Sequence, residues 1–132
     1  MKEWKEKYLD TFKIFIRFLK ENGFYGLLMN ERISSNTFEK YFFDSLINSK
    51  AISSWIVATM YCRYNDTEIW RKCDAMWLIY IINNYELLSN KLDIYETKDM
   101  LIGELKKIYT VPMILIETKK MIRNFLDEYS VT

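Results

Sequence analysis

The sequence predicts an all-α fold: a compact single-domain bundle of five to six helices with a central apolar helix at about residues 67–88. The 132-residue chain contains one proline and three glycines, which leaves few signals for strands and turns. Its apolar residues recur at a spacing close to 3.6 in most windows. Half of the residues are hydrophobic and 17% are aromatic, so a sizeable core can offset the entropy of folding. We therefore expect residues 1–132 to form one helical domain.

A first helix is expected from about Lys2 to Asn22. Its apolar residues cover more than half of the helix circumference, which indicates contact with at least two neighbouring elements. They are Trp4, Tyr8, Leu9, Phe12, Ile14, Phe15, Ile16, Phe18 and Leu19. Gly23 is typical of the left-handed residue that ends a helix. The following segment, Phe24 to Met29, is too apolar for an exposed loop, so it either folds under the bundle or presents apolar side chains to a partner.

Two further helices are expected at about 37–48 and 51–62. Asn36, followed three residues later by Glu39, resembles a capping box at the start of the first of them. The segment from Ala51 to Cys62 carries no charge, so the second should lie near the centre of the bundle.

The helix at about 67–88 contains eight consecutive apolar residues, Ala75 to Ile82. This run is too short to span a bilayer, which takes about 20 residues. One apolar stripe comprises Ile69, Trp70, Cys73, Met76, Trp77, Tyr80, Ile81 and Leu88, and a second comprises Ala75, Leu78, Ile79, Ile82 and Tyr85. A helix that is apolar on all sides must be covered on all sides. The second stripe therefore packs either in the core or against another molecule. Asn84, within the first stripe, is expected to bond a nearby carbonyl or a tyrosine hydroxyl.

The last two helices are expected at about 97–109 and 112–129. Pro112 fits the first turn of the second one, where its missing amide costs little. The apolar residues of the two helices are Leu101, Ile102, Leu105, Ile108 and Tyr109, and then Ile114, Leu115, Met121, Ile122, Phe125, Leu126 and Tyr129.

The chemistry of the sequence offers little for catalysis. The chain has no histidine, which removes the Ser-His and Cys-His nucleophile systems and the usual proton shuttle near neutral pH. Cys62 and Cys73 match neither a zinc spacing nor a disulfide framework and are interpreted as reduced core residues. Asp93, Glu96 and Asp99 could form a weak site for a hard cation, but carboxylates near a helix start are more often capping groups. We predict no catalytic residue, no metal ligand and no cofactor.

Two candidate surfaces follow from the sequence. The candidate protein-binding residues come from the second stripe and from the apolar segment after the first helix: Leu78, Ile79, Ile82 and Tyr85, with Phe24, Tyr25, Leu28 and Met29. The candidate nucleic-acid-binding residues lie on the last two helices: Lys106, Lys107, Lys119, Lys120 and Arg123. Acidic residues interrupt this basic face, and the formal net charge of +1 gives little of the basic excess on which phosphate binding depends.

The function expected from the sequence is a non-catalytic, cytosolic protein–protein interaction module that binds a target protein or a second copy of itself as a homodimer. The abundance of Ile, Lys, Asn, Tyr and Phe fits AT-rich codons. Such a composition suits a phage- or plasmid-encoded inhibitor, such as an anti-defence or immunity protein. No signal peptide opens the sequence, so we expect a cytoplasmic protein without a membrane span. The alternative is a nucleic-acid-binding accessory protein that uses the basic face.

Overall fold

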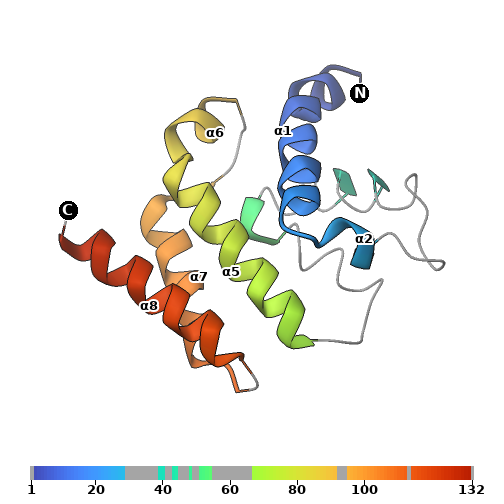
Figure 1. Ribbon diagram of the computed structural model, residues 1–132. Coiled ribbons are helices and arrows are strands. Elements are labelled where there is room, and N and C mark those ends of the chain that lie inside the picture. Colours follow the sequence, from blue (N-terminus) through green and yellow to red (C-terminus); the bar gives the residue numbers. More distant parts are fainter. Residues whose placement is uncertain are drawn as a thin grey trace.

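Helices make up every regular element in the part of the chain that the structure describes. The structure is a computed structural model, and it describes residues 2–28, 39–40, 43–44, 48, 51–54, 67–91, 95–112 and 114–131. The elements are α1 (Lys2–Glu21), α2 (Tyr25–Leu28), the 3₁₀ helix η1 (Ile52–Ser54), α5 (Thr67–Asn83), α6 (Tyr85–Lys91), α7 (Lys98–Thr110) and α8 (Ile116–Val131) (Figure 1). The described residues contain no strand, which confirms the predicted all-α bundle.

The end of α1 is built around Gly23, as the sequence predicts. Gly23 has a φ of 79°, in the left-handed region that other residues adopt only with strain. The amide of Phe24 donates to the carbonyl of Leu19 at 2.8 Å, and the amide of Gly23 donates to the carbonyl of Lys20 at 3.3 Å. This pair of bonds forms a Schellman motif, and the two apolar residues that it joins, Leu19 and Phe24, are both buried. The turn therefore directs Phe24 into the core.

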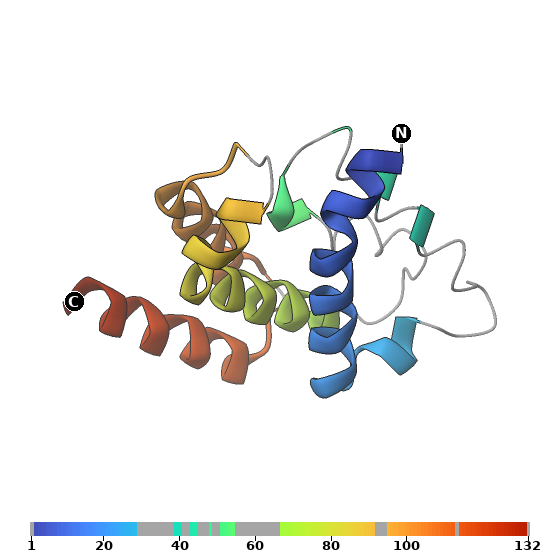
Figure 2. The same cartoon turned by 90° about the horizontal axis from the view of Figure 1, so that it is seen from above.

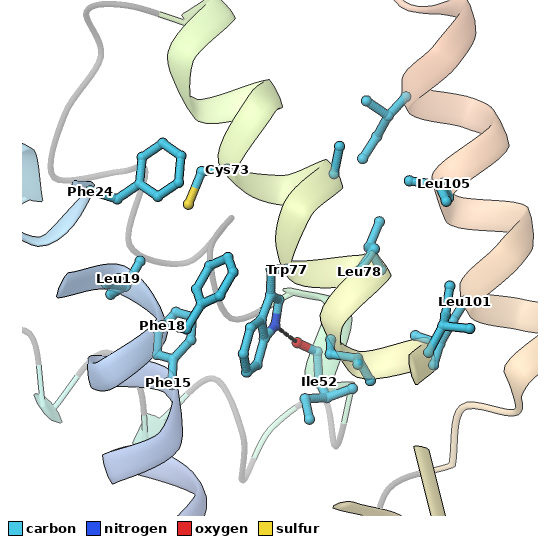
Figure 3. Close-up of a cluster of buried hydrophobic side chains, with 14 of the residues drawn as sticks. Phe15, Phe18, Leu19, Phe24, Ile52, Cys73, Trp77, Leu78, Leu101 and Leu105 are labelled. Carbon is cyan, nitrogen blue, oxygen red and sulfur yellow. Dashed lines mark hydrogen bonds between the residues drawn. The ribbon is translucent and has the colours of Figure 1, made fainter. Parts of the chain in front are cut away.

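Helix α5 lies at the centre of the bundle. On one side, Trp77 of α5 contacts Phe15 and Phe18 of α1, with ring centroids 4.8 Å and 5.1 Å apart. Figure 3 shows these rings packed between α1 and α5, while Leu78 lies on the side of α5 that faces α7. The indole Nε1 of Trp77 donates to the carbonyl of Ile52 at 3.1 Å, which satisfies the polar atom of this fully buried side chain. The predicted central helix is thus covered by α1 and η1 on one side and by α7 on the other.

The predicted helix at 67–88 is divided at Asn84. The amide of Asn84 donates to the carbonyls of both Tyr80 and Ile81 at 3.1 Å, and its side-chain Nδ2 donates to the Tyr80 carbonyl at 2.9 Å. A side-chain amide that bonds the backbone in this way competes with helical hydrogen bonding, so α5 ends and α6 begins at Tyr85. The prediction that Asn84 bonds a nearby carbonyl is confirmed, whereas the prediction of one continuous helix at 67–88 is wrong.

The turn between α7 and α8 also differs from the prediction. Pro112 lies in this turn and not in the first turn of α8, which begins at Ile116. Val111, immediately before the proline, has an extended backbone with φ −69° and ψ 133°. The proline ring disfavours helical geometry at the preceding residue, so Pro112 ends α7 instead of starting α8. Thr97 caps the start of α7, because its side chain accepts from the amide of Met100.

Several predictions lie largely or wholly outside the described residues. Of the helix expected at 37–48, residues 39–40, 43–44 and 48 are described, and all are helical. Of the helix expected at 51–62, only residues 51–54 are described, and Ile52–Ser54 forms a 3₁₀ turn. Cys62 and Asp93 are not among the described residues. Within the described ranges, no helix combines the length and the apolar character that crossing a bilayer requires.

Candidate functional site

The second apolar stripe of α5 is mostly covered by the chain itself. Leu78 and Ile82 are each 3% exposed and belong to the core. Figure 3 shows Leu78 on the side of α5 that faces Leu101 and Leu105 of α7. The structure thus supports the core alternative for Leu78 and Ile82, and neither side chain is accessible to a partner in this fold. The reason is that α7 packs along this side of α5, which residue spacing in one helix cannot reveal.

The remaining two residues of that predicted site have different surroundings. Tyr85 is half-buried; its hydroxyl donates to the backbone carbonyl of Glu96 at 2.7 Å, and the ammonium of Lys98 lies 5.8 Å from its ring centroid. Tyr85 therefore holds the start of α6 to the segment before α7. Ile79 is also half-buried, but it points into an open groove.

The second predicted protein-binding segment is only partly described. Phe24 is 4% exposed, and its ring lies 6.4 Å from the rings of Phe18 and Trp70, so it is a core residue and not a contact for a partner. Tyr25 is half-buried, with the ammonium of Lys20 4.9 Å from its ring centroid. Leu28 ends α2, while Met29 lies outside the described residues.

A groove of about 770 Å³ lies between α1 and α8, with α5 as its floor. Figure 2 shows α8 and the C-terminal end of α1 on the same side of α5. The side chains that give the groove its apolar character are Ile14, Phe18, Met76, Ile79, Tyr80, Met121 and Phe125. Its lining on α8 runs from Glu117 to Glu128, about three helical turns, or about 16 Å at the rise of an α-helix. We call this feature the α1–α5–α8 groove.

The rim of the α1–α5–α8 groove is polar and of mixed charge. It consists of two cations, three carboxylates and three carboxamides: Arg17 and Lys120, then Glu21, Glu117 and Glu128, then Asn22, Asn83 and Asn124. Glu117 also makes a 3.8 Å ion pair with Lys72 of α5. Within the described part of the chain, Arg17, Glu21 and Lys120 form no ion pair with one another or with any other described residue. These three side chains thus remain available to charges on a partner.

An apolar floor with a charged rim is suited to holding the apolar face of another polypeptide. A partner helix buries its apolar side chains along such a groove, and the rim then fixes the orientation of the helix through charge pairs. Two methionines and three aromatic side chains line the groove. Methionine adapts its shape to different contacts, and aromatic side chains contribute large contact areas, so both are enriched in protein interfaces.

The five basic residues considered for nucleic-acid binding are all exposed, but their surroundings differ; they are Lys106, Lys107, Lys119, Lys120 and Arg123. Lys107 lies 3.2 Å from Glu104 in an ion pair on α7. The ammonium of Lys119 lies 5.5 Å from the ring centroid of Tyr109, whereas Lys120 points to the α1–α5–α8 groove. Lys107 and Lys119 thus already contact other groups of the chain, and the adjacent residues Lys119 and Lys120 of α8 lie in different surroundings. The structure therefore places these basic residues in different surroundings.

Two buried titratable groups lie next to each other on α5, but neither lines the groove. Burial raises the pKa of Asp74 to about 7, an effect that the nearby charge of Arg71 partly opposes. Burial, with a smaller contribution from Asp74, raises the pKa of the Cys73 thiol well above its usual range. A thiol with a raised pKa is a poor nucleophile, so Cys73 acts as a small core residue, as the sequence predicts.

Of the carboxylates considered for a cation site, Glu96 and Asp99 are described and Asp93 is not. Glu96 is 3% exposed and accepts hydrogen bonds from the amide of Ser53 at 3.1 Å and from the Ser53 hydroxyl. Asp99 is exposed in the first turn of α7. The described residues contain no cluster of three or more side chains suited to hold a metal ion. Glu96 therefore has a structural role, in which it fastens the segment before α7 to η1.

Sequence reasoning assigned the groove residues Met121 and Phe125 to the buried face of the last helix. Both are half-buried, and they share a face of α8 with Lys120, Asn124 and Glu128. The only signal in the sequence is the position of these polar residues beside the apolar ones, which also occurs at the edge of any amphipathic face. The groove depends on the arrangement of α1, α5 and α8, which is a tertiary property.

In comparisons with known proteins, no family model matches this chain, and no curated protein or solved structure matches it.

Proposed function

We propose that this protein is a non-catalytic protein-binding module and that the α1–α5–α8 groove is its binding surface. The observation that carries the proposal is the open groove of about 770 Å³, lined by seven apolar side chains and edged by charged and amide groups. Burial of these apolar side chains would supply the driving force for association, at about 25 cal/mol per Å² before the costs of binding. The charged rim would supply orientation and specificity.

The more specific parts of the proposal rest on composition. A chain without histidine and with nearly balanced charges is suited to a role in binding, and the bias toward Ile, Lys, Asn, Tyr and Phe supports a source with AT-rich codons. We therefore retain an inhibitor encoded by a phage or plasmid, acting in the cytoplasm, as the specific form of the proposal. Nucleic-acid binding through Lys106, Lys107 and the basic residues of α8 is the weaker alternative, because Lys107 and Lys119 already contact Glu104 and Tyr109.

Affinity capture with matched variants tests the proposal. The baits are the wild-type protein, Met121→Glu and Met100→Glu. Met121 lines the groove, whereas Met100 is 43% exposed on α7 and does not line it, so the same substitution is made inside and outside the proposed surface. Lysate of the native host is divided into nuclease-treated and untreated portions, and bound proteins are eluted with stepped salt.

We expect a bound protein, either a host protein or an untagged copy of this chain, that binds the wild type and Met100→Glu, is lost with Met121→Glu, and remains bound after nuclease treatment and in high salt. An apolar contact persists in high salt, whereas phosphate contacts weaken steeply. Equal recovery by all three baits would contradict the assignment of the groove as the binding surface. Release of every bound protein by nuclease would support the nucleic-acid alternative instead.

A further inference from the structure

We propose that the occupant of the α1–α5–α8 groove is a second copy of this chain, bound through an antiparallel pair of α8 helices with a two-fold axis beside Asn124. This inference rests on the proposed function, because it takes the groove as the binding surface, and it adds the identity of the partner. In such a dimer, α8 is a wall of its own groove and also covers the floor of the groove in the other subunit.

The register of the helix pair follows from the charges on the groove-facing side of α8. Lys120, Asn124 and Glu128 all line the groove at successive intervals of four residues, so they lie along one face of the helix. Lys120 and Glu128 are each four residues, or about 6 Å, from Asn124. A two-fold axis at Asn124 places Lys120 level with Glu128 of the partner subunit, and by symmetry Glu128 level with the partner's Lys120. The face is therefore complementary in charge to itself in the antiparallel orientation.

The central asparagine is consistent with this register. The two-fold axis brings Asn124 next to the partner's Asn124, and each side-chain amide has both donors and an acceptor. A hydrogen bond between the two side-chain amides forms only when the two Asn124 residues are level, so it favours this register over shifted ones. Asn124 is exposed in the single chain, so it has no need of a partner within its own fold.

Apolar contacts in this register come from Met121 and Phe125. The axis places Phe125 level with position 123 of the other helix, within about 3 Å along the helix axis of the partner's Met121. A methionine sulfur near an aromatic ring is a favourable contact. The α8 helix of the partner would also cover Ile14 and Ile79, which are half-buried and line the groove from α1 and α5. The half-buried apolar side chains of both grooves thus become buried together.

The size of the groove predicts a weak but specific dimer. Fifteen residues line it, compared with about 20–30 residues and about 800 Å² per partner in an interface of standard size. The interface is therefore expected at the lower end of the size range of specific interfaces. We therefore expect dissociation at roughly micromolar concentration, where the fraction of dimer changes measurably with dilution.

Charge-swap variants test the register directly. The variants are Lys120→Glu, Glu128→Lys, the double variant with both changes, and an equal mixture of the two single variants. The matched controls are Lys106→Glu, which makes the same charge change on the exposed surface of α7, and Asp127→Lys, which changes the neighbour of Glu128 on a side of α8 that faces Tyr109. Sedimentation velocity from about 1 to about 200 µM measures the oligomeric state, across the range expected for so small an interface.

Wild-type protein and both controls should form dimers whose fraction rises with concentration. Each single variant replaces two attractive contacts by two repulsive ones, so its dimer should weaken by about tenfold or more. The double variant and the mixture restore opposite charges across the axis, so both should dimerise again, the mixture as heterodimers. All four substituted positions are exposed, and thermal unfolding of each monomer, measured beside its dimerisation, separates loss of the interface from loss of the fold.

Wild-type protein that remains monomeric at all concentrations would overturn the inference. A dimer that all single variants and controls weaken equally, or that the double variant fails to restore, would overturn it as well. These results are distinct from a failure of the proposed function. A monomeric protein whose capture of a host protein still depends on Met121 would keep the groove as a binding surface and would reject only the second copy as its occupant.

Discussion

Leu78 and Ile79 are adjacent in the sequence, and truncation of each to alanine should have very different effects on stability. Leu78 is 3% exposed and packs in the core between α5 and α7, whereas Ile79 is half-buried and lines the α1–α5–α8 groove. The pair therefore tests which side of α5 is core and which side is accessible. The substitutions are Leu78→Ala and Ile79→Ala, each of which removes side-chain carbons without adding a polar group.

The expected magnitude follows from burial. Leu78→Ala removes three carbons from a fully buried position, which costs about 2.4 kcal/mol at about 0.8 kcal/mol per buried carbon. The cavity that remains adds to this cost, so the total should reach about 3–4 kcal/mol. Ile79 faces an open groove, so its truncation leaves no closed cavity and should cost about 1 kcal/mol. A domain of this size has roughly 5–15 kcal/mol of stability, so the first change is large.

Urea unfolding followed by far-UV circular dichroism measures both effects. With an m-value of about 2 kcal/mol per molar urea, the midpoint should fall by about 1.5–2 M for Leu78→Ala and by about 0.5 M for Ile79→Ala. Binding of a partner in the α1–α5–α8 groove should instead be weakened by Ile79→Ala. Equal losses of stability in the two variants would refute the placement of α7 over Leu78. So would a Leu78→Ala protein of unchanged stability that has lost an oligomeric assembly.

Three other changes should alter stability in directions set by the structure. Burial raises the folded-state pKa of Asp74 to about 7, so the stabilising contribution of its protonated form is complete below about pH 4 and is lost as the pH rises through 7. Asp74→Asn should therefore raise the unfolding free energy at pH 8 by a few kcal/mol more than at pH 5, as measured by urea unfolding at both pH values. Glu96→Ala leaves the Ser53 amide and hydroxyl without their acceptor and should lower the unfolding free energy by about 2–3 kcal/mol, whereas Glu96→Gln retains an acceptor and should lower it less. Similar losses in both variants would contradict the role of Glu96 as the acceptor for Ser53. Gly103→Ala should raise the unfolding free energy by about 0.5–1 kcal/mol, because a Cβ at this helical position meets no atom within 4 Å. Gly23→Ala should lower it by about 1 kcal/mol, because Gly23 has a positive φ, so the melting temperatures of the two variants should shift in opposite directions.

Features that depend on short stretches of sequence were predicted well. The end of α1 at Gly23 is set by a local backbone conformation that few residues other than glycine adopt readily. The hydrogen bond from Asn84 to a nearby carbonyl is similarly local. The consequences of Asn84 and Pro112 for helix boundaries were predicted less well, because each residue is compatible with a helix in one position and ends it in another.

Features that depend on which helices pack against each other could not be predicted from the sequence. Leu78 and Ile82 could be assigned either to the core or to an interface until the position of α7 was known. Met121 and Phe125 have the spacing of core residues, yet they line an open groove because α1 and α8 diverge on one side of α5. Periodicity identifies which residues share a face of a helix, but the neighbour of that face is decided by packing.

Glu96 connects three segments that are distant in the sequence, and this connection has a consequence for how the protein opens. Its carboxylate binds Ser53 in η1, and its backbone carbonyl accepts from the hydroxyl of Tyr85 at the start of α6. None of the three segments can leave its place without breaking a bond at this one residue. Amide hydrogens in η1, at the start of α6 and at the start of α7 should therefore exchange with solvent as one cooperative unit, with a common opening free energy.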